Sequence, residues 1–364
     1  MSSLKIATWN VNSLRVRLPH LLDWLKANPV DVIGIQETKL QDEAFPGAEI
    51  EAAGYTGVTT QENRHDPFLS LAVAGYTTTR MELHTSVAIA FARSPMVCAN
   101  VGWDIAASTG GRFTLGLGSQ IRAHNEKRFS VPWTAPAPRM REYVQAVRAI
   151  WAAWKGDGKL NYVGKHYNFT LMTPNFVPEP YDAPAPRIGL AAVGPAMLKV
   201  AAEECDSAKL HVFCTRKYLE QAIQPILEAG LAKSGRKRED FEITGGGFVV
   251  TGKDDEAVQK LFDWVRYRVA FYGSTPAYWP VFEVHGLGDL GRKLNAMTKA
   301  GQWDKIAGEV SDDVVHLFSA VGRHDQLEKA VTERFGGLVD SISASASSSK
   351  PSDLPPGLIQ DLQR

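Results

Sequence analysis

From residue 55 onward, segments with the pattern of β-strands alternate with segments with the pattern of α-helices. Strands buried in a parallel sheet are short, nearly continuous apolar runs, whereas helices repeat apolar residues every three or four positions. This alternation predicts an α/β fold built on a parallel sheet. The strand-like segments are 55–60, 81–89, 112–118, 187–193, 209–213, 241–250 and 339–343, and helices are expected over 140–154 and 196–205.

Seven strands are one fewer than a closed (β/α)8 barrel requires, so the missing strand should precede residue 55. Two strand-like runs lie there, KIATWNV at 5–11 and VDVIGIQ at 30–36, with a helix-like stretch between them. The second run could fill the vacancy, which would leave the first as an extra unit. Farther along, we expect 160–174 to form a short antiparallel insertion and 254–335 to be mostly helical.

Composition restricts the partners of this chain. Its 364 residues include 40 basic and 40 acidic side chains, so the net charge gives no long-range attraction to nucleic acid or an anionic membrane. Cys98, Cys205 and Cys214 lack the spacing of a metal site and are expected to be buried structural thiols. No stretch is long and apolar enough to predict a membrane span. We expect a cytoplasmic protein with a small-molecule substrate, and the sequence leaves a homodimer open.

The first 54 residues resemble the start of an exonuclease III-type nuclease, in the strings TWNVNSLR and IQETK. In that family an Asn of the first strand and a Glu of the second help to hold a catalytic magnesium, and the matching positions are Asn10 and Glu37. The later GDxN and SDH-type motifs of the nuclease are missing from the sequence. Because two oxygen ligands do not make a magnesium site, we interpret Asn10 and Glu37 as vestigial and expect no metal.

Residues 48–344 resemble the luciferase-like monooxygenases, most closely the branch that uses the deazaflavin coenzyme F420. The most specific string is MELHTSVAIAFARSP, at 81–95. The resemblance implies a (β/α)8 TIM barrel of the luciferase-like type, with the cofactor at the C-terminal ends of the strands. The nuclease-like unit would replace or precede the first barrel strand. The expected domains are an exonuclease III-like fragment (1–54), the oxidoreductase barrel (55–344) and a disordered Ser/Pro-rich tail (345–364).

Several short motifs carry the expected cofactor site. In this family the third strand ends in a bulge with a non-proline cis peptide against the central ring of the cofactor, and the match falls on Ser86 and Val87. Two glycines in the next strand suit close approach of a flat ring, although such glycines often serve packing. A strand-to-helix turn at Gly194 offers backbone amides for the cofactor phosphate. The resemblance implies cofactor contacts from Thr85, Ser86, Val87, Gly116, Gly118, Ser119, Gln120, Ala192, Val193, Gly194 and Thr215.

Candidates for proton transfer follow the second barrel strand, where the family often carries a His or an acid facing the reactive ring. His65 and Glu62 occupy that position, and imidazole titrates near neutral pH. The alternative is a polar loop that caps the next helix through Asp66. An aromatic cluster resembles the substrate side of the deazaflavin branch, although such a cluster is otherwise core. It comprises Tyr272, Tyr278 and Trp279.

Taken together, the resemblance and the residues predict an oxidoreductase that passes a hydride between coenzyme F420 and an unidentified organic substrate. FMN is the second choice of cofactor, because glycine-rich contacts would suit either ring. One alternative is an exonuclease III-type DNA-repair nuclease, which the missing motifs contradict. Another is an inactive fusion product, in which the foreign N-terminus prevents closure of the barrel and leaves an open sheet edge.

Overall fold

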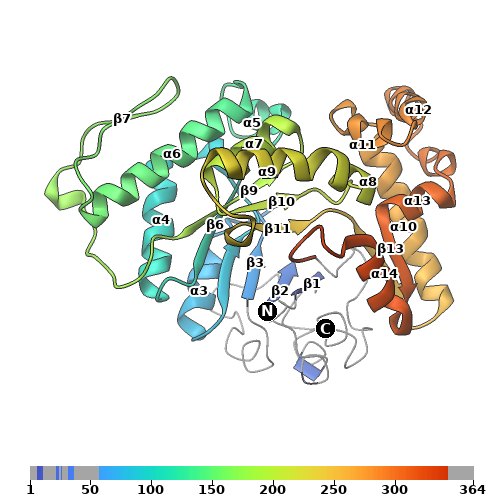
Figure 1. The fold of residues 1–364 in the computed structure, drawn as a ribbon, viewed down its shortest axis with the longest axis horizontal. Coiled ribbons are helices and arrows are strands. Elements are labelled where there is room, and N and C mark those ends of the chain that lie inside the picture. The colour runs from blue at the N-terminus through green and yellow to red at the C-terminus, as the bar shows by residue number, and fades with distance from the viewer. Residues whose placement is uncertain (1–5, 11–21, 24–25, 27–31, 37–56, 343–364) are drawn as a thin grey trace.

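The computed structural model describes residues 6–10, 22–23, 26, 32–36 and 57–342. Figure 1 shows parallel strands in the middle of the molecule with helices packed around them. The strands follow the order β1-β2-β3-β4-β6-β9-β10-β11 across one curled sheet, and every neighbouring pair along this path is parallel. The parallel α/β class expected from the sequence is therefore confirmed.

The strands are short, and all the main ones except β13 overlap runs where strands were expected, although the single run at 241–250 is divided into β11 and β12. A two-residue strand pairs with β6 beyond a break after β4, and β12 and β13 form a separate parallel pair. The main strands are Ile6–Asn10 (β1), Val32–Gln36 (β2), Gly57–Thr60 (β3), Glu82–Thr85 (β4), Ala88–Ile89 (β5), Phe113–Gly118 (β6), Arg187–Ala192 (β9), Ser207–Leu210 (β10), Glu242–Gly245 (β11), Phe248–Gly252 (β12) and Ser319–Arg323 (β13).

The strand next to β3 comes from the N-terminal segment. β2 pairs with β3, and β1 pairs with the other side of β2, so the run at 30–36 fills the vacancy and the run at 5–11 is the extra unit. The register of this pair places Asn10 opposite Gln36. Glu37, most of segment 1–54 and the tail 345–364 lie outside the described residues, and the expected domain boundaries stay predictions.

Helices cover the outside of the sheet, and their ends carry recognisable signals. Ser94 accepts the Met96 N–H at the start of α4, and Gly156 ends α6 with φ of 87°. α6 and α7 confirm the two helices expected from periodicity. The helices are Leu69–Thr77 (α3), Pro95–Ser108 (α4), Arg122–Lys127 (α5), Pro136–Lys155 (α6), Pro195–Glu204 (α7), Arg216–Tyr218 (α8), Gln224–Lys233 (α9), Asp255–Gly273 (α10), Trp279–Glu283 (α11), Gly288–Lys299 (α12), Asp312–Phe318 (α13) and Leu327–Phe335 (α14).

The core lies between these helices and the sheet. Trp103 of α4 and Trp151 of α6 are fully buried, and the Trp151 indole donates to the Ala99 carbonyl at 3.1 Å. All three cysteines are buried, as expected, and burial raises the pKa of the Cys98 thiol to about 11. None of the helices in the described part of the chain is both long and apolar enough to span a bilayer.

The expected insertion is present. Tyr162–Val163 (β7) and Asn168–Phe169 (β8) form a small antiparallel pair, which extends from the end of α6 at the upper left of Figure 1. Its surroundings carry exposed apolar side chains, among them Val163, Leu171 and Phe176.

In the C-terminal part the expected helical stretch is confirmed, but one strand was not predicted and one expected strand does not form in the described residues. Segment 254–335 is mostly helical, but it contains β13, which we did not predict. A run of Ser, Ala, Val, Gly and Arg has weak strand preference, and pairing with β12 determines its structure instead. Conversely, segment 339–343 is no full strand, because in the described residues it contributes an isolated bridge between Ser341 and Thr244 of β11.

Candidate active site

The end of β4 forms the bulge that the sequence predicted, with a cis peptide bond between Ser86 and Val87. The Thr85 hydroxyl donates to the Gly116 carbonyl and accepts the Gly116 N–H, at 2.8 Å each. A Cβ on Gly116 would lie 1.8 Å from the Thr85 carbonyl oxygen, and one on Gly118 would lie 2.5 Å from Val87 Cγ2. Both glycines therefore make room for the bulge, and their contacts match the packing interpretation.

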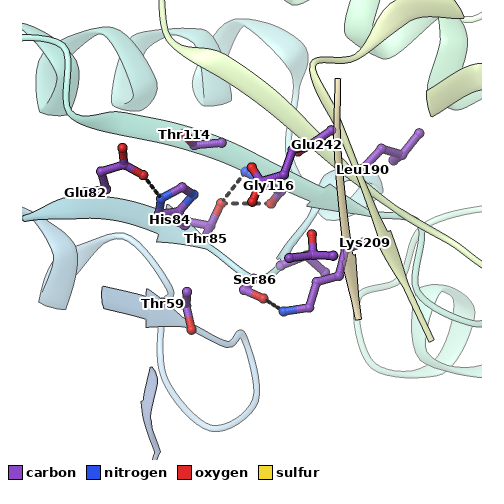
Figure 2. A pocket seen from close by; sticks show the side chains of 14 residues that line it. Thr59, Glu82, His84, Thr85, Ser86, Thr114, Gly116, Leu190, Lys209 and Glu242 are labelled. Carbon is purple, nitrogen blue, oxygen red and sulfur yellow. Dashed lines mark hydrogen bonds and ion pairs between the residues drawn. The ribbon is translucent and has the colours of Figure 1, made fainter. Parts of the chain in front are cut away.

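A cavity of about 90 Å³, with several charged side chains in its lining, opens beside this bulge, inside the curve of the sheet (Figure 2). Because side chains alternate along a strand, positions 82 and 84 of β4, 207 and 209 of β10, and 242 and 244 of β11 share this inner face. Interiors of such barrels are usually filled by bulky branched side chains, so a cavity lined in part by charged side chains is unusual. The lining residues are Thr59, Glu82, His84, Thr85, Ser86, Val87, Thr114, Gly116, Gly189, Leu190, Ser207, Lys209, Glu242 and Thr244.

The two carboxylates of the cavity have partners of their own. Glu82 Oε2 lies 3.1 Å from His84 Nε2, and this hydrogen bond lowers the pKa of Glu82. Glu242 Oε2 lies 3.7 Å from Arg187 Nη2. The inner wall thus holds its negative charges in pairs.

Asn125, in α5, is a buried side chain that we did not predict. Its Nδ2 donates to the Ser119 carbonyl at 2.9 Å and to the Ile121 carbonyl at 3.0 Å, which fixes the orientation of the amide. Its Oδ1 is buried without a hydrogen-bond partner. Next to it, Gln120 adopts φ of 54°. A buried free acceptor in the helix that follows β6 fits an N–H of a bound ring.

The turn after β9 is open. Ala192 ends the strand, and Val193 and Gly194 lead to Pro195, the first residue of α7. A Cβ built on Gly194 meets nothing within 4 Å, in contrast to Gly116. Space in front of a helix N-terminus is suited to an anionic group, so this turn fits the phosphate position that the resemblance implies.

The loop after β3 carries the two proton-transfer candidates. Glu62 Oε2 accepts the Ile89 N–H and an Arg93 N–H, both at 2.7 Å, and Arg93 also donates to Asp66 Oδ2 at 2.8 Å. Asp66 Oδ1 accepts the N–H of Phe68, the residue before α3, at 2.8 Å. His65 is exposed. These contacts anchor the loop, but α3 begins after Phe68 without a side-chain cap, and proton transfer by His65 or Glu62 stays a prediction.

The aromatic side chains gather around a histidine that the sequence did not single out. His211 follows β10, and its ring centroid lies 4.5 Å from that of Tyr272 and 4.7 Å from that of Tyr278. The Phe213 N–H donates to His211 Nδ1 at 3.0 Å, so the ring proton is on Nε2, 3.4 Å from the Tyr278 hydroxyl oxygen. Burial, with a smaller effect from Arg268, lowers the pKa of His211 to about 4, which keeps the imidazole neutral.

Two other predicted residues have their polar groups engaged within the protein. The Trp279 indole donates to the Gly273 carbonyl at 3.0 Å, away from the other two aromatic candidates. Thr215 Oγ1 accepts the Tyr218 N–H at 3.2 Å and lies 2.8 Å from His285 Nε2. Their predicted ligand contacts remain untested.

The curled parallel sheet, the helices around it and the bulge at the end of β4 together define an α/β-barrel protein. The model of the family described as luciferase-like monooxygenase matches residues 36–341. The chain belongs to this family.

Two relatives in sequence are informative. An uncharacterized protein of Mycobacterium tuberculosis, Rv1360, is 46% identical over 304 residues, which cover 84% of this chain and 89% of the relative. A putative coenzyme F420-dependent oxidoreductase of the same species is 29% identical and covers 84% of this chain and 91% of the relative.

Solved structures confirm the TIM-barrel fold of the luciferase-like type. The coenzyme F420-dependent tetrahydromethanopterin reductase of Methanopyrus kandleri superimposes with a TM-score of 0.69 at 17% identity, covering 100% of this chain and 98% of its own. The oxygenating constituent of 3,6-diketocamphane monooxygenase of Pseudomonas putida, in complex with FMN, gives 0.60 at 13% identity, covering 100% and 97%. The nuclease alternative gains no support from these comparisons.

Proposed function

We propose that the protein is an oxidoreductase that passes a hydride between coenzyme F420 and a small organic substrate, with FMN as the second candidate cofactor. The observation that carries this proposal is the pairing of the Thr85–Ser86 bulge, packed against Gly116, with the open turn at Gly194, in a chain whose relatives include a putative F420-dependent oxidoreductase. A bound deazaflavin would supply the carbon that gives or takes the hydride.

Residues around the bulge fit such a group. Asn125 would accept an N–H of the ring, because its Oδ1 is buried and has no partner. The turn at Gly194 would hold a phosphate through backbone amides at the start of α7. Fixed contacts of this kind orient a ring before reaction, and orientation is the main requirement of hydride transfer.

A proton must accompany the hydride when the substrate carries a carbonyl or a similar group. We assign this role to Tyr278, because the Nε2–H of His211 points to its hydroxyl oxygen and leaves the phenol proton free to be donated. Burial raises the pKa of Tyr278 to about 12, which keeps the hydroxyl protonated at neutral pH. His65 remains the alternative from the loop after β3.

Fluorescence titration of the purified protein with oxidised coenzyme F420, and separately with FMN, tests the proposal. We expect saturable binding of F420 that is tighter than binding of FMN. Tight FMN binding with weak F420 binding would transfer the proposal to the second candidate. A folded protein that binds neither cofactor would refute both.

A further inference from the structure

Lys209 is a cation in the wall of the cavity, and the function described so far does not use it. Its side chain extends from β10 toward the bulge, where Nζ contacts the Ser86 hydroxyl (Figure 2). The side chain is exposed, and it lines the cavity between the strands. The ammonium group therefore lies at the inner face of the bulge, open to whatever fills the cavity.

No carboxylate among the described residues forms an ion pair with Lys209, although two carboxylates line the same cavity. Glu82 pairs with His84, and Glu242 lies near Arg187. Enclosure by the sheet lowers the pKa of Lys209 to about 8, so the amine is still mostly protonated at neutral pH. A cation that faces a cavity without a counter-ion attracts negative charge, so an anion bound in the cavity would be stabilised by Lys209.

The two candidate cofactors differ in this respect. The oxidised ring of a flavin is neutral, whereas the 8-hydroxy group of an oxidised deazaflavin ionises near neutral pH and spreads negative charge through the ring. Charge placed beside such a ring is one of the means by which a protein controls its chemistry. We propose that Lys209 is a specificity-determining residue that selects an anionic 8-hydroxydeazaflavin ring over a neutral flavin ring. The inference rests on the proposed function, because it requires the ring to lie at the bulge.

The test compares the dissociation constants of oxidised F420 and FMN for the unchanged protein, Lys209→Met and Lys209→Arg, at about pH 7. Methionine keeps the length of the side chain and removes its charge, whereas arginine keeps the charge. We expect Lys209→Met to weaken F420 binding about tenfold, with FMN binding unchanged. Lys209→Arg should keep most of the preference for F420. Lys260→Met, at an exposed position of α10, is the matched control and should change neither constant.

A second measurement needs no variant. Absorbance of F420 bound to the unchanged protein is titrated with pH, and we expect its ring hydroxyl to ionise about one pH unit lower than in free F420. The selectivity role would be overturned if Lys209→Met weakened the binding of both cofactors equally or of neither. It would also be overturned if the pKa of the bound ring hydroxyl equalled that of free F420. Failure of the unchanged protein to bind F420 would instead overturn the proposed function itself.

Discussion

Glycines 116 and 194 both belong to the predicted cofactor site, and their surroundings give them opposite roles. A Cβ on Gly116 would overlap the Thr85 carbonyl oxygen, whereas a Cβ on Gly194 meets nothing within 4 Å. Gly194 has φ of −91° and ψ of 162°, which any residue adopts. One glycine is therefore required by the fold and the other leaves space for a ligand.

This contrast gives a paired prediction. Gly194→Ala should weaken F420 binding at least about fivefold, by roughly 1 kcal/mol, because the methyl group occupies the expected phosphate space, while unfolding free energy stays equal or rises by about 0.5 kcal/mol. Gly116→Ala should lower the free energy of unfolding by more than about 4 kcal/mol or prevent folding. Urea unfolding and fluorescence titration measure both. Unchanged F420 affinity in Gly194→Ala would show that the cofactor phosphate does not bind at this turn.

His211 predicts a pH dependence of stability. Its pKa is lowered from 6.5 to about 4 in the folded protein, so between these values the unfolded chain binds a proton that the folded protein does not. Stability contributed by the neutral imidazole is complete above about pH 6.5 and decreases as the pH falls toward 4, by at most about 1.4 kcal/mol per pH unit.

The corresponding experiment is urea unfolding between about pH 4.5 and 7 for the unchanged protein and His211→Asn. Asparagine keeps an acceptor for the Phe213 N–H but does not titrate in this range. We expect a flatter pH dependence in the variant. Identical slopes would mean that the pKa of His211 is the same in the folded and unfolded states.

At the scale of elements, the loop after β3 is fastened to the segment after β5 by Arg93, which binds Glu62 and Asp66. The Glu62 side chain is 8% exposed, so losing its partner leaves an enclosed charge. Arg93→Met should lower unfolding free energy by about 3 kcal/mol. Arg122→Met, which breaks an exposed pair within α5, should cost less than about 0.5 kcal/mol. Equal effects in the two variants would show that the loop is not held by this ion pair.

Strands with continuous apolar runs could be predicted from the sequence, because burial on both faces leaves a strong pattern. β13 could not, because its pairing with β12 outweighs weak local preference. At the site, the bulge at Ser86 was recognised from a specific string. Asn125 and His211 were missed, because the role of a single polar residue depends on its neighbours in the fold. Asn125 stands out only through its unpaired Oδ1, and His211 only through its contacts with two tyrosine rings.

At the scale of the whole molecule, cofactor binding should raise the free energy of unfolding. A ligand that binds only the folded state at one hundred times its dissociation constant adds about 2.7 kcal/mol. We therefore expect oxidised F420 at that excess to raise the thermal midpoint by several degrees. Differential scanning fluorimetry measures the shift, with inorganic phosphate at the same concentration as control. If inorganic phosphate alone raised the thermal midpoint, the stabilisation would come from anion binding at the turn at Gly194 and not from the ring. If F420 did not raise it, the proposed cofactor would be contradicted.

In β10, side chains from Ser207 to Leu210 alternate between the inner and outer faces of the sheet. The strand lies between two parallel neighbours, β9 and β11. One inserted or deleted residue within this strand would turn Lys209 outward and bring Ala208 and Leu210 into the lumen. The same change in a connecting loop would leave the lumen intact. Insertions and deletions are thus tolerated in the loops between the strands. Within β10, inserting or deleting one residue would replace the charged lining of the cavity with an apolar one.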